Sequence, residues 1–284
     1  MKKPSLYILI VFALSGLQLT AQEIPFDANA LEKAWESEAV FKVPESVFHD
    51  AERDVLYVSN IDGKPTNMDG NGFISKVNTQ GEVIKLKWVE GLNAPKGMGT
   101  FNGKLYVTDI NAVVEIDIAE GKVLNRYTVD GAKFMNDIAI TDDGTLYATD
   151  MQTNKIHKLE NGTIALWLEN EKLKSPNGLL IHGDKLLVGC KQMLAIDLSD
   201  KSISVKVPEM QHGIDGIVKD KNGNLIFSYW QGNVFIYTPE GELTEVLSTA
   251  DRKMQSADIG IIVQKNVLLV PTFFDNRIMA YTIK

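Results

Sequence analysis

A short run of residues of the type Leu-Tyr-Val-Thr-Asp recurs six times along the chain, and this repeat sharply limits how the chain can fold. Successive copies are 49, 41, 40, 39 and 43 residues apart, a mean period of about 42 residues. Repeats of about 40 to 45 residues built from strands are typical of β-propellers, in which each repeat forms one blade. The copies begin at Leu56, Leu105, Leu146, Leu186, Leu225 and Leu268.

The residues around each copy alternate between apolar and polar types, between turns that contain Gly, Asn or Asp. The third copy, for example, is preceded by such a run at 138–144 and followed by another at 156–164. Alternation with a period of two residues between these turns predicts antiparallel hairpins. Four strands in each of six units predict an all-β fold, a six-bladed β-propeller with four antiparallel strands per blade. Residues 27–37 are the one candidate helix.

The two ends of the repeat region indicate how the ring closes. The last unit has three expected strands, at residues 259–263, 268–272 and 278–283, and needs a fourth. The apolar stretch at residues 39–43 is expected to supply it, which closes the ring and removes open sheet edges. We therefore expect the propeller to span residues 39–284, with residues 23–38 as an N-terminal lead-in.

Residues 1–22 have the character of a secretory signal peptide. Lys2 and Lys3 precede an apolar run at residues 6–19, which is followed by small and polar residues. The run is short for a membrane span, and an uncleaved anchor is the alternative. No cysteine lies near the expected cut, so no lipid attachment is expected. The sequence thus predicts a periplasmic or secreted protein that does not bind a membrane after signal cleavage.

The charge and cysteine content of the chain exclude some classes of partner. The formal net charge is −8, and residues 1–22 contribute two lysines and no acids, so the mature chain is more acidic still. An acidic surface repels phosphate backbones, so nucleic acid is not an expected partner. Cys190 is the single cysteine, so packing rather than an internal disulfide must hold the fold together. We expect a monomer or a weak oligomer.

Polar residues occupy the position that opens the first strand of each predicted blade. In a propeller these strands line the axis and run in the same direction, so their openings meet at one end of the channel. Carboxylates gathered there repel one another unless a cation binds among them. Alternatively, the Asp-Gly, Asn-Gly and Asn-Asp pairs are ordinary turn chemistry. The expected ring consists of Glu45, Lys96, Asn136 with Asp137, Asn177, Asp215 and Asp258.

The donor atoms of this ring indicate which ion it would hold. The ring offers oxygen ligands and neither Cys nor His, which favours a hard divalent cation over a closed structural zinc site. We expect one ion, with Ca²⁺ first and Mg²⁺, Mn²⁺ or Zn²⁺ as alternatives.

Five short motifs, in this order and spacing, resemble the gluconolactonase / regucalcin / luciferin-regenerating-enzyme family, the senescence-marker-protein-like six-bladed propellers. They are Glu-Ser-Val at 45–47, Met-Asn-Asp-Ile-Ala at 135–139, Ser-Pro-Asn-Gly-Leu at 175–179, Ile-Asp-Gly-Ile at 214–217 and Ser-Tyr-Trp-Gln-Gly at 228–232. The resemblance covers nearly the whole mature chain, and paraoxonase-like lactonases share the arrangement more distantly. It implies a propeller with one metal ion in its channel. Glu45, Asn177 and Asp215 would be ligands, with Asn136 on or near the metal and facing the substrate.

Two residues depart from the pattern of the sugar-lactone members. Those members carry an arginine two residues before the substrate asparagine, where this chain has Phe134, which argues against gluconolactone itself. Lys96 stands in the slot that matches Asn177 in the shared Pro-x-Gly frame. Its cation would bind a substrate carboxylate or stabilise a developing oxyanion. Alternatively, its stem packs on the channel wall and its head reaches solvent.

The expected function is a divalent-metal-dependent hydrolase of lactones or related cyclic esters, with a small-molecule lactone or ester as substrate. A channel metal polarises the carbonyl and holds the attacking water. The expected base is Asp215, with Asp137 as second candidate. His212 is the histidine best placed to transfer protons, with a surface role as the alternative. The competing hypothesis is a non-catalytic, metal-stabilised propeller that binds a sugar, peptide or protein partner.

The loops between second and third strands are expected to surround the mouth of the channel. Their methionine and aromatic residues predict a partly apolar entrance, with Trp230 either there or wedged between blades. The longest loop, residues 60–72, would be either a lid or a flexible insertion.

Overall fold

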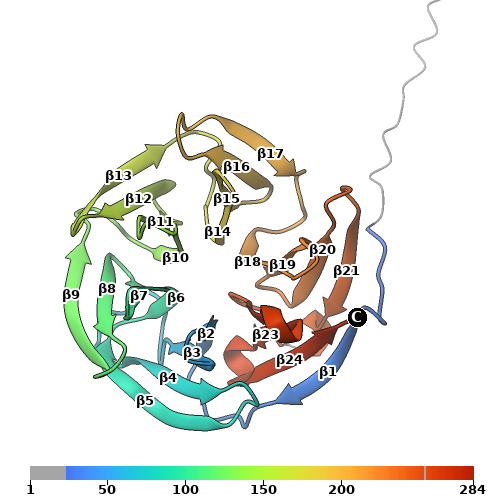
Figure 1. Cartoon of the computed structure of the whole chain (residues 1–284), viewed down its shortest axis with the longest axis horizontal. Coiled ribbons are helices and arrows are strands. Elements are labelled where there is room, and N and C mark those ends of the chain that lie inside the picture. Colours follow the sequence, from blue (N-terminus) through green and yellow to red (C-terminus); the bar gives the residue numbers. More distant parts are fainter. Residues whose placement is uncertain (1–23, 253) are drawn as a thin grey trace, which may run out of the picture.

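The computed structural model forms a closed ring of six four-stranded antiparallel sheets arranged around a central channel (Figure 1). It describes residues 24–252 and 254–284, so the expected signal peptide lies outside the described residues. The prediction of a six-bladed β-propeller is confirmed. Among the described residues there are three short 3₁₀ turns and no α-helix, and hence no helix long and apolar enough to cross a membrane.

Each blade runs from an inner strand to an outer strand in chain order. Blade 1 contains β2 (Pro44–Asp50), β3 (Val55–Asn60), β4 (Gly72–Asn78) and β5 (Val83–Leu92), and blade 2 contains β6 (Pro95–Phe101), β7 (Lys104–Asp109), β8 (Ala112–Asp117) and β9 (Lys122–Thr128). Blade 3 contains β10 (Met135–Ile140), β11 (Leu146–Asp150), β12 (Lys155–Glu160) and β13 (Thr163–Glu169), and blade 4 contains β14 (Leu179–His182), β15 (Lys185–Gly189), β16 (Met193–Asp197) and β17 (Ile203–Val207). Blade 5 contains β18 (Ile214–Lys219), β19 (Leu225–Tyr229), β20 (Asn233–Tyr237) and β21 (Leu243–Ser248).

Blade 6 is closed by an N-terminal strand, but not by the expected one. It contains β22 (Gly260–Ile262), β23 (Val267–Pro271), β24 (Ile278–Ile283) and, at its outer edge, β1 (Leu31–Glu36). The expected helix at 27–37 is therefore wrong, because this stretch contains β1. The spacing of four residues between Leu31 and Trp35 resembles a helix repeat. In the structure, β1 is irregular between Lys33 and Trp35, and the two side chains pack in different clusters, Leu31 beside blade 5 and Trp35 beside blade 1.

The stretch at residues 39–43, expected to be the closing strand, instead connects blade 6 to blade 1 without regular pairing. Phe41 is fully buried in the core between these blades. The backbone N–H of Val43 donates to Asn276 Oδ1 at 2.9 Å, and Val43 has a φ of 52°. The ring therefore begins at Leu31, within the segment expected to be a lead-in.

The core lies between neighbouring blades, where one face of each sheet packs against the next. Tyr57 of blade 1, for instance, packs in a cluster with Leu105 and Ile116 of blade 2. Cys190 is buried in a similar cluster, and its burial raises the pKa of the thiol to about 11.

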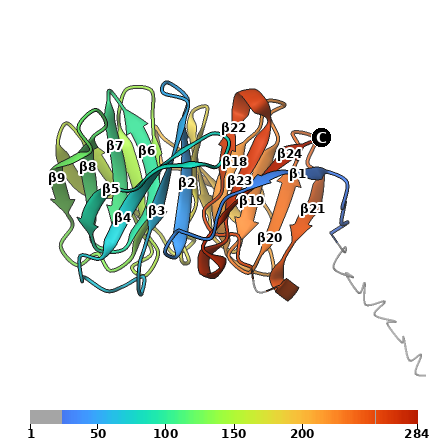
Figure 2. The ribbon, with the colours of Figure 1, turned by 90° about the horizontal axis from the view of Figure 1, so that it is seen from below.

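The inner strands β2, β6, β10, β14 and β18 stand closest to the axis, and the outermost strands form the rim (Figure 1). The side view in Figure 2 shows that the strands run between the two faces of the ring. Because all inner strands run in the same direction, their first residues lie at one face.

Candidate active site

One cavity of about 430 Å³, here called the mouth pocket, gathers the residues that open the inner strands. Its floor carries the four proposed metal ligands together with one lysine. These residues are Glu45, Lys96, Asn136, Asn177 and Asp215. The chain thus brings to one place side chains that are up to 170 residues apart in sequence.

The Thr-Asp pairs that end the second and third repeat copies explain why these strand openings are fixed. The hydroxyl of Thr149, in the third copy, accepts from the backbone N–H of Asp137 in its own blade at 3.0 Å. It also donates to the carbonyl of Asn177 in the next blade at 3.0 Å. The carboxylate of Asp150, the next residue, accepts from the backbone N–H groups of Lys133 and Phe134, each at 3.0 Å. The repeated Thr-Asp pair therefore fixes the backbone of the residues on the pocket floor and of those that precede them in the chain.

In the sixth blade the residue equivalent to Asn136 and Asn177 is Ala257 rather than Asp258, and Ala257 does not line the mouth pocket. Ser228, which matches Thr149 in its repeat, donates its hydroxyl to the carbonyl of Ala257 at 2.8 Å. Asp258 is thus one residue further along, at the position that matches Asp137. Because successive side chains of an extended strand point in opposite directions, this shift of one residue turns Asp258 away from the mouth pocket.

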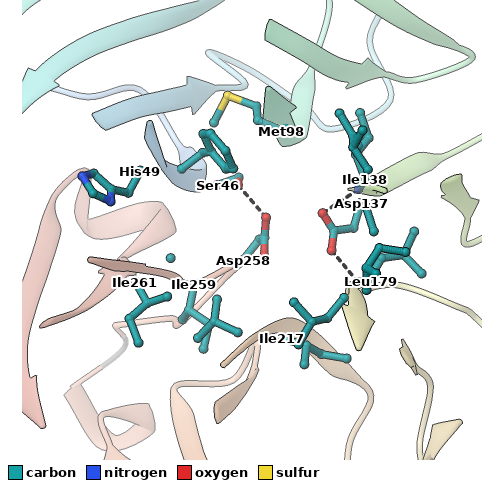
Figure 3. A pocket seen from close by; sticks show the side chains of 18 of the residues that line it. Ser46, His49, Met98, Asp137, Ile138, Leu179, Ile217, Asp258, Ile259 and Ile261 are labelled. Carbon is teal, nitrogen blue, oxygen red and sulfur yellow. Dashed lines mark hydrogen bonds between the residues drawn. The ribbon is translucent and has the colours of Figure 1, made fainter. Parts of the chain in front are cut away.

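Asp137 and Asp258 line a second, larger space of about 570 Å³, here called the channel cavity, which continues along the inner strands. Figure 3 shows their carboxylates pointing into it, between isoleucines and Leu179. Asp137 accepts backbone N–H bonds from Ile138 at 2.6 Å and Leu179 at 2.5 Å, while burial raises its pKa to about 7. Burial also raises the pKa of Asp258, whose carboxylate accepts the Ser46 hydroxyl at 2.5 Å. The second base candidate, Asp137, therefore does not line the mouth pocket.

The two carboxylates of the mouth pocket, Glu45 and Asp215, are buried. Glu45 is 5% exposed, and its Oε2 atom has no hydrogen-bond partner. Burial, reinforced by the charge of Asp215, raises the pKa of Glu45 well above its usual value. Asp215 accepts from Asn177 Nδ2 at 2.6 Å, and burial raises its pKa to about 7. Such a pair stays ionised at neutral pH only if a cation compensates it.

Lys96 keeps its ammonium group inside the pocket. The side chain is 1% exposed, and Nζ donates to the carbonyl of Ala94 at 2.8 Å. Nζ also lies 4.6 Å from the centre of the Phe134 ring. Burial lowers the pKa of Lys96 to about 8, and the charge of Glu45 opposes that decrease. Of the two alternatives for Lys96, the one in which its head reaches solvent is therefore wrong.

The walls of the mouth pocket are mainly apolar, with Lys64 of the long loop as a charged exception. Trp230 meets Phe273 and Phe274 edge to face, with ring centres 5.5 Å and 6.1 Å apart. Residues from the long loop also contribute, but only from its first part, between Ile61 and Pro65. The sequence indicated these loops and Trp230, which lies in the lining, but it did not single out Phe273 or Phe274. The apolar residues in the lining are Ile61, Pro65, Phe134, Met151, Trp230, Phe273 and Phe274.

His212 is not among the lining residues of either cavity. Its ring packs edge to face on Tyr229, with ring centres 5.5 Å apart.

The donor set of the mouth pocket fits a hard cation. In the part of the chain that the structure describes, no three His, Cys, Asp or Glu side chains form a group that could hold a metal. A metal in the mouth pocket would therefore depend on two carboxylates and two amides, which are oxygen ligands of the kind that Ca²⁺ and Mg²⁺ prefer. The unpaired, buried Oε2 of Glu45 is the feature that such an ion would satisfy.

Residues 43–257 match the family model described as SMP-30/gluconolactonase/LRE-like region. The chain belongs to this family. The match covers more than half of the chain and includes every residue of the mouth pocket except Phe273 and Phe274. The family resemblance drawn from the motifs is thus confirmed.

Solved structures with the same fold include two proteins that their titles name as a virginiamycin B lyase and a streptogramin B lyase. A catalytically inactive variant of virginiamycin B lyase from Staphylococcus aureus, crystallised with quinupristin, is 17% identical, with a TM-score of 0.62 over 89% of this chain and 99% of that chain. A streptogramin B lyase is 14% identical, with a TM-score of 0.65 over 89% of this chain and 97% of that one. At these identities the likeness shows the fold alone. A comparison with curated protein sequences finds no match.

Proposed function

We propose that this family member is a divalent-metal-dependent hydrolase of lactones or related cyclic esters that acts in the mouth pocket. The observation that carries the proposal is the buried, unpaired Oε2 of Glu45, beside Asp215 and two amide side chains. Membership in the SMP-30/gluconolactonase/LRE-like family supports a lactonase-like reaction.

Glu45, Asn136, Asn177 and Asp215 would hold the ion, with Ca²⁺ as the first choice. When bound, the ion supplies positive charge that polarises the ester carbonyl and acidifies a water molecule. The contact between Asn177 Nδ2 and Asp215 Oδ1 fixes the orientation of both side chains before the ion arrives.

The residues of the pocket have separate roles in the proposed reaction. Asp215 accepts the proton of the attacking water, because its carboxylate lies on the pocket floor beside the other ligands of the ion. Lys96 has two N–H groups beyond the one that bonds to Ala94, and it donates one to the oxygen that gains negative charge. Asn136 orients the substrate, and the apolar walls exclude bulk water.

The experiment is a lactone hydrolysis assay on the purified protein before and after chelation, with each divalent ion restored in turn. We expect turnover to disappear with the chelator and return with one ion. Glu45→Gln and Asp215→Asn should abolish this turnover, whereas Glu240→Gln, which alters an exposed acid, should not. Turnover that survives in Glu45→Gln would contradict the ligand assignment. A melting temperature lowered by the chelator, with no turnover on any lactone or ester, would favour the non-catalytic binding module.

We also propose export to the periplasm or the medium, directed by residues 1–22, and action as a monomer or weak oligomer. The basic start and apolar run of these residues support the proposal. Cell fractionation and the N-terminal sequence of the secreted protein test it, and a full-length cytoplasmic product would contradict it.

A further inference from the structure

We infer that the mouth pocket selects lactones or cyclic esters whose ring carries an apolar alkyl or aryl substituent, in preference to polyhydroxylated rings. The inference rests on the proposed function, since it specifies the substrate of that site. It concerns the walls of the pocket, whereas the proposed function depends on the floor.

Polar and apolar side chains are segregated within the mouth pocket. Most of the charged and amide groups lie on the floor, where Asn177 donates to Asp215 at 2.6 Å, whereas Lys64 lines the pocket from the long loop. The walls consist mainly of aromatic and aliphatic side chains. A substrate that places its ester on the floor therefore directs the rest of its ring toward apolar atoms.

The aromatic side chains of the wall are partly exposed to solvent. Trp230 is 38% exposed and Phe274 is 60% exposed, although both are large apolar side chains. The rings of Trp230, Phe273 and Phe274 contact one another edge to face, so they form a continuous surface. Large apolar surface left open beside a polar floor marks a binding site for a ligand of matching polarity.

The backbone at Phe273 is strained. Phe273 has a φ of 51°, a left-handed conformation that bulky residues rarely adopt. The turn that contains it is fixed on both sides, because Thr272 Oγ1 accepts from the backbone N–H of Arg277 at 2.9 Å and Asn276 Oδ1 accepts from that of Val43 at 2.9 Å. Backbone strain maintained by surrounding contacts is typical of functional sites, and here it directs an aromatic ring into the pocket wall.

Phe134 makes the wall of this pocket unsuitable for hydroxyl groups. Its backbone N–H is held by Asp150 at 3.0 Å, and its ring lines the wall beside the Lys96 ammonium. Each hydroxyl group placed against such a wall would lose its hydrogen bonds to water without replacement. An alkyl or aryl group gains free energy from the same contact.

The test measures how rate and affinity depend on substituent length. γ-Lactones with substituents from methyl to pentyl are compared with glucono-δ-lactone, at saturating Ca²⁺. We expect KM to fall about fourfold per added methylene until the pocket is full. Binding of the matching γ-lactams, which resist hydrolysis, is measured by calorimetry and should show the same dependence.

Trp230→Ala and Phe274→Ala should flatten this dependence on chain length for both the lactones and the lactams. The control is Phe26→Ala, which removes a phenylalanine that is 56% exposed but does not line the pocket, and it should retain the full dependence. Hydrolysis that is equally efficient for all substituents, or best for glucono-δ-lactone, would overturn the inference and leave the proposed hydrolase intact. Lactam binding that strengthens with chain length, in a protein that hydrolyses no lactone, would overturn the proposed reaction and support the apolar pocket.

Discussion

At the scale of single residues, Lys96 distinguishes this site from a simple ring of oxygen ligands. A lysine with 1% exposure is rare unless it is paired, and here its partners are a backbone carbonyl, an aromatic ring and the carboxylate of Glu45. The ammonium therefore compensates part of the negative charge of the floor. It also remains available as a donor at the point where an ester oxygen would gain charge.

Replacing Lys96 by methionine, which keeps the volume of the stem, tests this role. We expect kcat to fall by about 100-fold, the usual cost of removing one oxyanion donor. The fold should persist, because an apolar side chain replaces a desolvated charge. Circular dichroism and steady-state kinetics on the best lactone check this. A kcat within twofold of the parent would show that Lys96 only packs.

The raised pKa values of Asp137 and Asp215 predict how stability depends on pH in the metal-free protein. Each folded-state pKa of about 7 lies above the usual aspartate pKa of 3.8. A group of this kind favours folding below its unfolded pKa, and that contribution is lost as pH rises through the folded pKa. The melting temperature of the chelated protein should therefore decline between about pH 4 and pH 7.

Saturating Ca²⁺ should raise the melting temperature more at pH 8 than at pH 5, because it binds the ionised form of Glu45 and Asp215. Thermal unfolding followed by circular dichroism, with and without chelator, provides the measurement. Equal stabilisation by Ca²⁺ at both pH values would contradict a site made of these carboxylates. In Asp137→Asn, the melting temperature of the chelated protein should decline less as pH rises. Ca²⁺ should still raise the melting temperature of this variant.

At the scale of elements, the second strand of a blade positions the site, although none of its side chains lines the mouth pocket. Thr149 of β11 connects β10 of its own blade to the opening of the next blade, and Ser228 of β19 makes the matching pair of bonds. The pairing of β10 with β11 is also irregular between Met135 and Ile138, where Asn136 and Asp137 lie. Irregularities of this kind redirect side chains beside active sites.

Thr149→Val tests the positioning role of β11. The change keeps the shape but leaves the Asp137 N–H and the Asn177 carbonyl without a partner, which should cost about 1 to 3 kcal/mol of unfolding free energy. Ca²⁺ affinity should fall as well, since Asn177 is a proposed ligand and Asp137 directly follows Asn136, another proposed ligand. Urea unfolding and calorimetric Ca²⁺ titration measure both. Thr163→Val, on the exposed side of β13, is the control, and an identical result for the two variants would contradict the prediction.

At the scale of the whole molecule, closure of the ring depends on contacts that recur from blade to blade. Trp35 of β1 packs over Gly81, in the outer hairpin of blade 1, as Trp88 of β5 packs over Gly121 in blade 2. A Cβ atom at Gly81 would lie 2.5 Å from the Trp35 ring. The equivalence of Trp35 and Trp88 shows that β1 is the true outer strand of blade 6.

Trp35→Ala should weaken this closure. We expect a loss of about 2 to 3 kcal/mol, because the indole packs between the last blade and the first. Urea unfolding should show a lower midpoint, and deletion of residues 24–36 should in addition promote aggregation through the open edge of β24. The matched control is Trp230→Ala, which removes an indole that plays no part in closure, and a midpoint equally low in both variants would contradict the assignment.

The sequence by itself determined the number of blades, the strand pattern within the first five of them, the family and five residues that meet in the mouth pocket, namely Glu45, Lys96, Asn136, Asn177 and Asp215. These properties depend on local alternation and on a period of about 42 residues, and both can be recognised in the sequence without knowing which distant residues are in contact. Tertiary structure alone decided which of two neighbours faces which cavity, as for Asn136 and Asp137, because an irregularity of one residue reverses the side of a strand. It also decided that Leu31–Glu36 closes the ring, that the Lys96 head stays inside and that His212 lies outside both cavities. Each of these outcomes depends on which residues of other blades lie beside the residue in question. The neighbours of that residue in the sequence do not determine this.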